Sequence, residues 1–152
     1  MTDSSMTLII SSSEQMEALG ARIARAITIP AVIHLRGELG AGKTTLVRGV
    51  LRELGHIGLV KSPTFTLVES YSLNTIEAHH FDLYRLNDPQ ELDYIGLSEY
   101  CHEHSVCFFE WPDLGGKLVP KACCEIELAY HDDGRECSLK GWVLTSLGLY
   151  ST

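Results

Sequence analysis

The sequence predicts an α/β fold with three layers, in which helices flank a central mixed, largely parallel sheet that also carries antiparallel hairpins. Two observations indicate this class. Strand patterns and helix patterns alternate along the chain, as they do in proteins built from strand-helix-strand units. A glycine-rich segment also joins one buried strand directly to one helix. The sequence has no internal repeat, low-complexity tract or linker that would divide it, so we expect a single domain over residues 1–152.

The N-terminal part of the chain predicts a strand followed by an amphipathic helix. Residues Thr7 to Ile10 form a short apolar run typical of a strand. Ser11 and Glu14 have the spacing of a capping box, which marks the first turn of a helix. The apolar residues of this helix are spaced by three or four positions, and the helix ends before Pro30. These residues are Met16, Leu19, Ile23 and Ile27.

The middle of the chain predicts the centre of the sheet. Residues 31–36 form a mostly buried strand, and a helical pattern extends from about Lys43 to Leu54. Phe65 to Leu73 and Ile76 to Phe81 are strand patterns on either side of Asn74, a turn residue, so we expect an antiparallel hairpin.

The last third predicts a short helix, a central strand and a second hairpin. A helical region begins at Asp88-Pro89 and extends towards Tyr100, with an interruption at Gly96. Val106 to Phe109 is an apolar strand that ends in Glu110, at a ligand-binding edge of the sheet. The final hairpin pairs Glu125 to Tyr130 with Arg135 to Leu144. Its turn is Asp132-Asp133-Gly134.

Composition narrows the class of protein. Apolar residues make up 45% and charged residues 21% of the chain, as in folded domains. The net charge of -8 argues against a general phosphate-binding face for nucleic acid. The five cysteines form no Cys-x-x-Cys pair, and the metal-capable residues of 101–107 match no usual zinc spacing, so we expect reduced thiols. A signal peptide and an apolar run of membrane-spanning length are both absent from the sequence, which predicts a cytoplasmic protein.

The glycine-rich segment predicts a phosphate-binding loop and, with it, a P-loop NTPase fold. It matches Gly-x-x-x-x-Gly-Lys-Ser/Thr at every position and lies between a strand and a helix. Backbone N–H groups would surround phosphate at the positive end of the helix dipole, and Lys43 would reach the terminal phosphates. The Thr44 hydroxyl would ligate Mg²⁺, and Thr45 would add a hydroxyl near the α-phosphate. The residues expected to bind ATP or GTP here are Gly37, Glu38, Leu39, Gly40, Ala41, Gly42, Lys43, Thr44 and Thr45.

A nucleotide hydrolase also needs an acidic residue that orients a metal ion or the attacking water. Asp82 and Glu110 each follow a predicted strand, and both are candidates. Thr64, in the Lys61-to-Thr66 connection, either senses the γ-phosphate or simply opens a strand. Arg135 either approaches the nucleotide from the last hairpin or, as we expect, is a solvated residue at a strand end. Trp111 is either an interaction anchor or a packing residue.

The chain resembles the bacterial TsaE (YjeE) family over about residues 12–131. Four blocks in the same order carry the resemblance. They are Gly37 to Thr45, Lys61 to Glu69, His80 to Leu86 and Glu110-Trp111-Pro112.

The resemblance implies an ATPase that acts with the proteins TsaB and TsaD in threonylcarbamoyladenosine modification of tRNAs reading codons that begin with A. Thr44 and Glu110 match the family's magnesium-site residues, Asp82 matches its acidic residue near the phosphates, and Thr64 matches its switch. Lys43 would stabilise the transferred phosphoryl, with Asp82 or Glu110 orienting metal and water. ATP or its product ADP and Mg²⁺ are the expected ligands. We expect weak intrinsic hydrolysis, stimulation by the partners, and tRNA contact only through the complex.

Three other functions share the same loop. A small-molecule kinase needs an arginine-bearing lid, and the scattered arginines suggest none. A regulatory GTPase needs an Asn-Lys-x-Asp segment, which the sequence lacks. A nucleotide-gated assembly module without essential turnover needs nearly the same residues as the ATPase.

Overall fold

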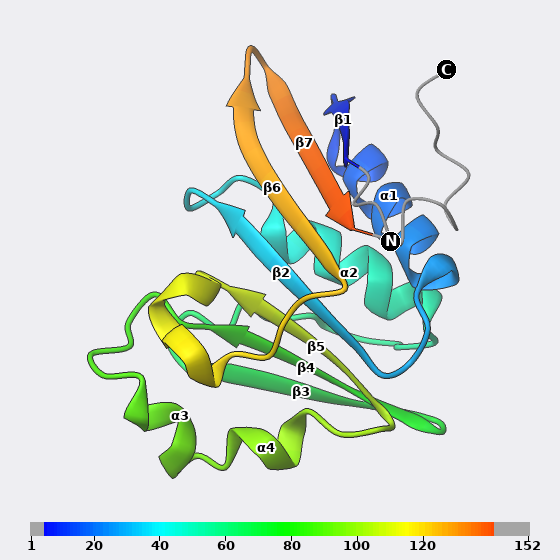
Figure 1. The fold of residues 1–152 in the computed structure, drawn as a ribbon. Helices are drawn as coiled ribbons and strands as arrows, with labels where there is room; N and C mark the ends of the chain where they lie inside the picture. The colour runs from blue at the N-terminus through cyan, green and yellow to red at the C-terminus, as the bar shows by residue number, and fades with distance from the viewer. Residues whose placement is uncertain (1–4, 142–152) are drawn as a thin grey trace.

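The fold is a single seven-stranded mixed sheet, seen in a computed structural model that describes residues 5–141 (Figure 1). The strands lie in the order β1-β7-β6-β2-β5-β4-β3. They are β1 (Ser5–Ile10), β2 (Ala31–Gly37), β3 (Val68–Leu73), β4 (Ile76–Asp82), β5 (Ser105–Glu110), β6 (Cys124–His131) and β7 (Gly134–Gly141). The helices are α1 (Ser13–Ala26), α2 (Lys43–Glu53), α3 (Gln90–Tyr94), α4 (Leu97–Tyr100) and the 3₁₀ helix η1 (Pro112–Leu118).

The centre of the sheet is parallel and its margins are antiparallel. Strands β6, β2, β5 and β4 pair in parallel, so their carboxyl ends meet at one edge. Strand β3 pairs antiparallel with β4, and β7 pairs antiparallel with both β6 and β1. The predicted mixed α/β fold is therefore confirmed, including both hairpins.

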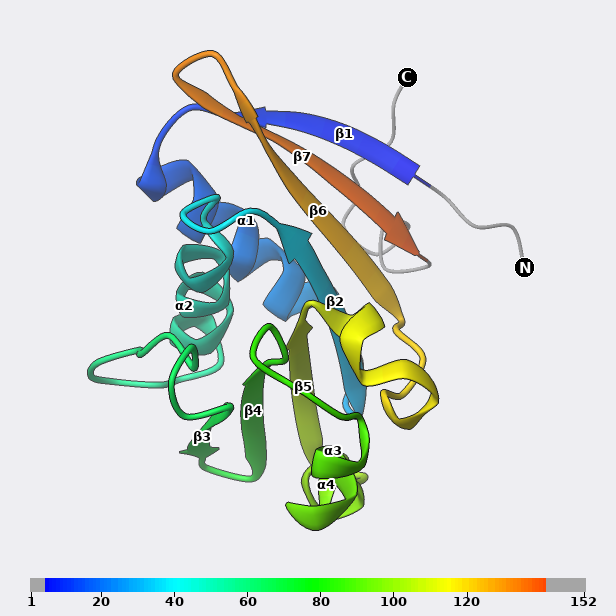
Figure 2. The ribbon, with the colours of Figure 1, turned by 90° about the vertical axis from the view of Figure 1, so that its left-hand side faces the viewer.

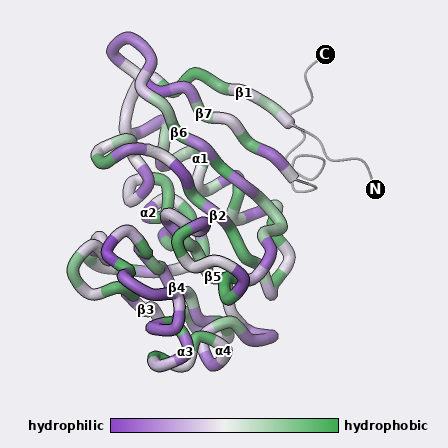
Figure 3. Tube along the Cα trace, turned by 60° about the vertical axis from the view of Figure 1, so that its left-hand side comes forward, coloured by the Kyte–Doolittle hydropathy of each residue, from purple (hydrophilic) through white to green (hydrophobic). Residues whose placement is uncertain are grey.

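Each face of the sheet has its own apolar core, because successive residues of a strand point to opposite faces. Helices α1 and α2 lie on one side of the sheet and η1 on the other (Figure 2). Val106 and Phe108 of β5 belong to the core beneath α1 and α2, while Cys107 and Phe109 belong to the core that includes α3 and α4. The tip of the β6–β7 hairpin, by contrast, is hydrophilic (Figure 3). Within residues 5–141, each helix is too short or too polar to cross a membrane.

The cap of α1 lies one residue later than the sequence predicted. The Ser12 hydroxyl, not that of Ser11, accepts a hydrogen bond from the Gln15 amide at 3.1 Å. The Gln15 side chain in turn accepts the Ser11 amide at 2.7 Å. Ser12 and Gln15 have the same spacing as Ser11 and Glu14, so the sequence pattern alone fits both positions equally.

The start of β3 also differs from the prediction. Strand β3 begins at Val68 and not at Phe65, because the amides of Thr66 and Leu67 donate to the Pro63 carbonyl and form a turn. Leu67 adopts a φ of 70°, which is incompatible with a strand. In the final hairpin, β7 is described to Gly141, and the predicted residues 142–144 lie outside the described part of the chain.

Helices α1 and α2 pack backbone to backbone at two glycines. A Cβ atom at Gly49 would lie 2.2 Å from the Glu17 carbonyl oxygen, and one at Gly20 would lie 2.4 Å from that of Leu46. Only a residue without a side chain permits this approach, which seats α2 and the loop before it against α1.

Replacing Gly49 with alanine should lower the free energy of unfolding by about 1–3 kcal/mol because the new methyl group overpacks the helix pair. The sign of this change in stability is informative, because glycine-to-alanine replacement in an exposed helix interior stabilises a protein by roughly 1 kcal/mol. Urea denaturation measures the effect. Arg52→Ala, on the exposed surface of α2, is the control and should change stability by less than about 1 kcal/mol.

Candidate functional site

The glycine-rich segment folds as a loop between β2 and α2. Gly40 and Gly42 adopt φ values of 78° and 109°, a region that other L-residues rarely occupy. Gly42 is the N-cap of α2, and the Ala41 amide donates to the Glu38 carbonyl at 3.1 Å. The loop therefore ends at the positive end of a helix of 11 residues, as a phosphate site requires.

A pocket opens on the inner side of this loop, at the carboxyl ends of β4 and β5. It brings together most of the residues that the sequence predicted for nucleotide and metal binding. They are Leu39, Gly40, Gly42, Lys43, Thr44, Thr45, Thr64, Asp82 and Glu110, and Ser62 also lines the pocket. Of the other predicted residues, Glu38 is exposed, Ala41 is buried beneath the loop, and the Gly37 carbonyl faces the Lys43 ammonium.

The Lys43 ammonium is held at the floor of the site by three groups. It donates to the Gly37 carbonyl at 2.5 Å and lies 3.4 Å from Glu110 Oε1. The ring of Trp111 is the third partner, with its centroid 4.7 Å from Nζ. The side chains of Lys43 and Glu110 are each only 5% exposed, so this ion pair lies away from solvent.

Glu110 receives a second contact from His80, a residue whose role the sequence analysis did not identify. His80 Nε2 lies 2.5 Å from Glu110 Oε2, and the His80 side chain is fully buried. Burial raises the pKa of Glu110, but the His80 hydrogen bond, the charges of His80 and Lys43, and the Lys43 hydrogen bond together outweigh it and lower the pKa. Glu110 is therefore an ionised carboxylate at neutral pH.

Asp82 joins the sheet to the segment before β3. Its Oδ2 accepts from the Thr64 hydroxyl at 3.3 Å, and its Oδ1 accepts from the Tyr84 amide at 3.0 Å. The Thr64 hydroxyl also contacts that of Ser62 at 2.8 Å. The structure thus places Thr64 in contact with Asp82, the acidic residue predicted for the site. Thr64 lies in a turn and does not open a strand.

The aromatic residues near the site have distinct positions. Trp111 contacts both Lys43 and the ring of Tyr84, with ring centroids 5.0 Å apart in the second pair. Arg85 stacks over the ring of Phe65 at 4.4 Å. Trp111 therefore contacts the site through Lys43, and its buried indole N–H has no protein partner among the described residues.

The expectation that Arg135 is a solvated strand-end residue is wrong. Its Nε donates to the Ala41 carbonyl and its Nη2 to the Gly40 carbonyl, both at 3.1 Å. The guanidinium also stacks on Tyr130, whose hydroxyl donates to the Leu39 carbonyl at 2.8 Å. The β6–β7 hairpin thus holds three consecutive carbonyls of the loop from outside. This contact spans more than 90 residues of sequence, and no local pattern indicates it.

The residues of the pocket fit a magnesium nucleotide. Thr44, Asp82 and Glu110 offer hydroxyl and carboxylate oxygens, which Mg²⁺ prefers. Lys43 and the N-terminus of α2 offer positive charge for phosphate. A second pocket on the outer side of the loop adjoins Thr45 and is lined by Ser11, Ser12, Met16 and Arg135.

Comparison with known proteins identifies one family. The family model described as "Threonylcarbamoyl adenosine biosynthesis protein TsaE" matches residues 10–137. A Haemophilus influenzae protein named tRNA threonylcarbamoyladenosine biosynthesis protein TsaE is 47% identical over 71% of this chain and 68% of its own. A Bacillus subtilis protein of the same name is 38% identical over 81% and 77%. The crystal structure of Bacillus subtilis YdiB superposes with a TM-score of 0.80 at 28% identity, covering 97% of both chains.

The buried pair of Glu110 and Lys43 makes stability depend on pH. A carboxyl group whose pKa is lowered by folding stabilises the protein above its unfolded pKa, and this stabilisation is lost as the pH falls through its folded pKa. Glu110→Gln should therefore lower the free energy of unfolding by roughly 2–4 kcal/mol at neutral pH. The difference from wild type should shrink as the pH falls below the ordinary glutamate pKa of about 4.3, and vanish below the lowered pKa of the folded state, where the wild-type carboxyl is also neutral. Urea titrations across this range measure it, with Glu53→Gln in an exposed ion pair as the control.

On the expectation from the sequence that this loop binds MgATP, Arg135→Ala should weaken that binding about tenfold, because the loop carbonyls lose the guanidinium that orients them. Equilibrium titration with a fluorescent ATP analogue measures this effect. Lys140→Ala removes the same charge from an exposed position of β7 and is the control. Equal weakening by the two variants would attribute the effect to net charge and contradict a positioning role.

Proposed function

The chain belongs to the TsaE family, and we propose that it is a magnesium-dependent ATPase that acts with the proteins TsaB and TsaD in threonylcarbamoyladenosine modification of tRNAs reading codons that begin with A. One observation supports this proposal above the others. The P-loop lysine is paired with a buried carboxylate at 3.4 Å, in a pocket that also contains Thr44 and Asp82. These residues provide the positive charge and the oxygen ligands that phosphoryl transfer from ATP needs.

Different residues of the site would bind the phosphates and the metal ion. The amides of the glycine-rich loop and the ammonium of Lys43 bind the phosphate oxygens. Thr44, with Glu110 and Asp82, would hold Mg²⁺, which when bound neutralises charge on the transferred phosphoryl. Lys43 already has an anionic partner in Glu110. When ATP binds, the Lys43 ammonium would therefore exchange one anionic partner, Glu110, for another, the phosphate, and would remain paired.

The two carboxylates would act mainly by orientation. Glu110 is held on one oxygen by His80 and approached on the other by Lys43. Its lowered pKa makes it a weak base, which favours a role in orienting the metal or its water over a role in removing a proton. The Thr64 hydroxyl donates to the Asp82 carboxylate, so a movement of the Ser62-to-Thr64 segment would be transmitted directly to a carboxylate of the site.

Weak turnover by the isolated chain follows from the positions of its arginines. Arg135 is the arginine that contacts the phosphate loop, and its Nε and Nη2 donate to loop carbonyls rather than facing the phosphate pocket. Arg85 is stacked on Phe65. A partner protein would therefore supply the charge that accelerates hydrolysis, as partners of other P-loop proteins do. Leu39, Phe65 and Tyr84 are exposed at or near the pocket and provide an apolar surface for such a partner.

The net charge of -8 favours tRNA contact through the partners and not through this chain. The chain's part in the modification would then be to couple its ATP cycle to the complex that holds the tRNA.

The test is phosphate release from MgATP by the purified chain, alone and mixed with TsaB and TsaD. We expect slow release alone, strong stimulation by the partners, and a loss of at least about a hundredfold in stimulated rate for Glu110→Gln, since the change removes a site carboxylate. Glu103→Gln, an exposed carboxylate on the α4–β5 connection, is the control.

Two results would contradict the proposal. Tight ATP binding without partner-stimulated turnover would indicate a nucleotide-gated assembly module. Phosphate transfer to a small molecule, with little release to water, would indicate a kinase.

A further inference from the structure

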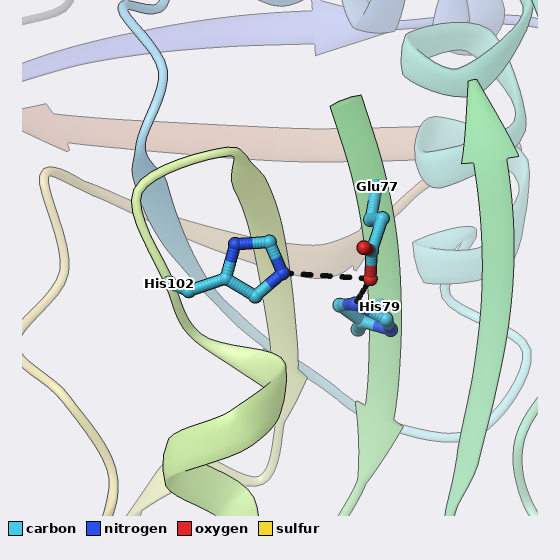
Figure 4. A group of neighbouring side chains, drawn as sticks. All are labelled: Glu77, His79 and His102. Atoms are coloured by element: carbon cyan, nitrogen blue, oxygen red, sulfur yellow. Dashed lines mark hydrogen bonds and ion pairs between the residues drawn. The ribbon is translucent and has the colours of Figure 1, made fainter. Parts of the chain in front are cut away.

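Three side chains with metal-binding atoms meet on β4 and the α4–β5 connection. Glu77 and His79 lie two residues apart on β4, and His102 follows α4 (Figure 4). Their ligand atoms all lie within 4.8 Å of one another. His79 Nε2 is 3.0 Å from Glu77 Oε1, and His102 Nε2 is 3.5 Å from the same oxygen.

This cluster is separate from the nucleotide pocket. Alternate residues of a strand share a face, so Glu77 and His79 lie on the face of β4 opposite to His80 and Asp82. His79 packs edge-on against Tyr100 of α4, with ring centroids 5.0 Å apart. The pairing of Glu77 with Ser105 also places the cluster at the start of β5, whereas Glu110 ends that strand.

Two of the three distances between ligand atoms are close to those of a zinc coordination sphere. Zinc binds histidine nitrogen and carboxylate oxygen at about 2.0–2.2 Å, so ligand atoms in a tetrahedral site are roughly 3.3–3.5 Å apart. The two contacts to Glu77 Oε1, at 3.0 and 3.5 Å, lie near this spacing. A metal ion would replace the hydrogen bonds that now join the three side chains, with small shifts of the side chains.

His79 is oriented as a ligand by its other nitrogen. Its Nδ1 lies 2.7 Å from the Ser70 hydroxyl, on the neighbouring strand β3. Without metal, Nε2–H donates to the Glu77 carboxylate and Nδ1 accepts from the Ser70 hydroxyl. Metal binding would move the proton to Nδ1, which would then donate to the Ser70 oxygen and leave the Nε2 lone pair for the ion, as second residues commonly set the tautomer of a metal-binding histidine. The ring is buried, and burial lowers the pKa of His79, so it is neutral at pH 7.

The outer two ligands can adapt to an ion. The Glu77 and His102 side chains are 49% and 32% exposed. His102 Nδ1 accepts the His104 amide at 3.1 Å, so Nε2 of the neutral ring carries the proton in this arrangement. Metal binding would move the proton to Nδ1 and release the His104 amide to water, which an exposed site permits at small cost.

We propose that Glu77, His79 and His102 form a binding site for a zinc-class divalent cation, with water as the fourth ligand. Two imidazoles and one carboxylate favour Zn²⁺ over Mg²⁺, which prefers oxygen ligands. The bound ion joins the α4–β5 connection to β4. Residues 101–107 contain only one of the three ligands, His102, and the other two lie on β4. The two cysteines of this stretch, Cys101 and Cys107, contact each other at 3.0 Å.

The test is Zn²⁺ binding to the metal-free full chain, measured by competition with a chromophoric chelator. We expect one Zn²⁺ per chain, and affinity reduced at least tenfold by Glu77→Gln and by His102→Ala. Ser70→Ala should weaken binding by roughly tenfold through the tautomer of His79. His104→Ala is the matched control, because His104 is an exposed histidine of the same connection. It should leave the affinity unchanged.

Two further measurements separate loss of the metal site from loss of folding and from binding by cysteines. Thermal unfolding without metal shows whether each variant is folded, and added Zn²⁺ should raise the melting temperature of wild type and His104→Ala but not of His102→Ala. With Co²⁺, the ligand-field bands should appear without thiolate charge transfer. Thiolate charge transfer would assign the ion to cysteines, and equal affinity of wild type and His102→Ala would exclude His102 as a ligand; either result would overturn the proposal.

Discussion

The ion pair between Lys43 and Glu110 is the constraint on which the rest of the site depends. Both side chains are almost completely buried, and an unpaired charge in such a place costs several kcal/mol. Each charge is therefore surrounded by compensating groups. The Gly37 carbonyl and the Trp111 ring contact the ammonium, while His80 contacts the carboxylate. The pair thus holds the phosphate loop of β2 against the end of β5.

Parallel pairing is what brings these groups together. Leu35 of β2 and Asp82 of β4 are both in register with Glu110 of β5, so Gly37, Glu110 and Asp82 lie near one edge of the sheet. The sequence allowed this arrangement to be predicted because each strand ends directly at a chemically distinctive residue. Where strands are parallel, such residues meet at their carboxyl ends without any further information. The glycine-rich loop between β2 and α2, the positions of Asp82 and Glu110 at strand ends, and the mixed sheet were therefore predictable from local patterns.

The parts that could not be predicted depend on contacts between distant segments. Arg135 follows an ordinary hairpin turn, and only the fold of β6 and β7 over the loop brings it to the Gly40 and Ala41 carbonyls. His80 stands in a strand where a histidine is unremarkable, yet the alternation of β4 directs it to Glu110. Leu67 lies within a good strand pattern, but the bonds to Pro63 impose a turn. In each case tertiary structure overrides or adds to a local pattern.

Strand β4 shows how one short element can serve two sites with different chemistry. Its even residues His80 and Asp82 face the phosphate loop, and its odd residues Glu77 and His79 face α4. On the first face Asp82 offers carboxylate oxygens, whereas the second face meets two imidazoles and one carboxylate. The type of donor atom at each site would therefore select the cation that binds there: Mg²⁺ at the oxygen ligands and a zinc-class cation at the imidazoles. The odd and even side chains lie on opposite sides of the sheet, so the two proposed sites share no side chain.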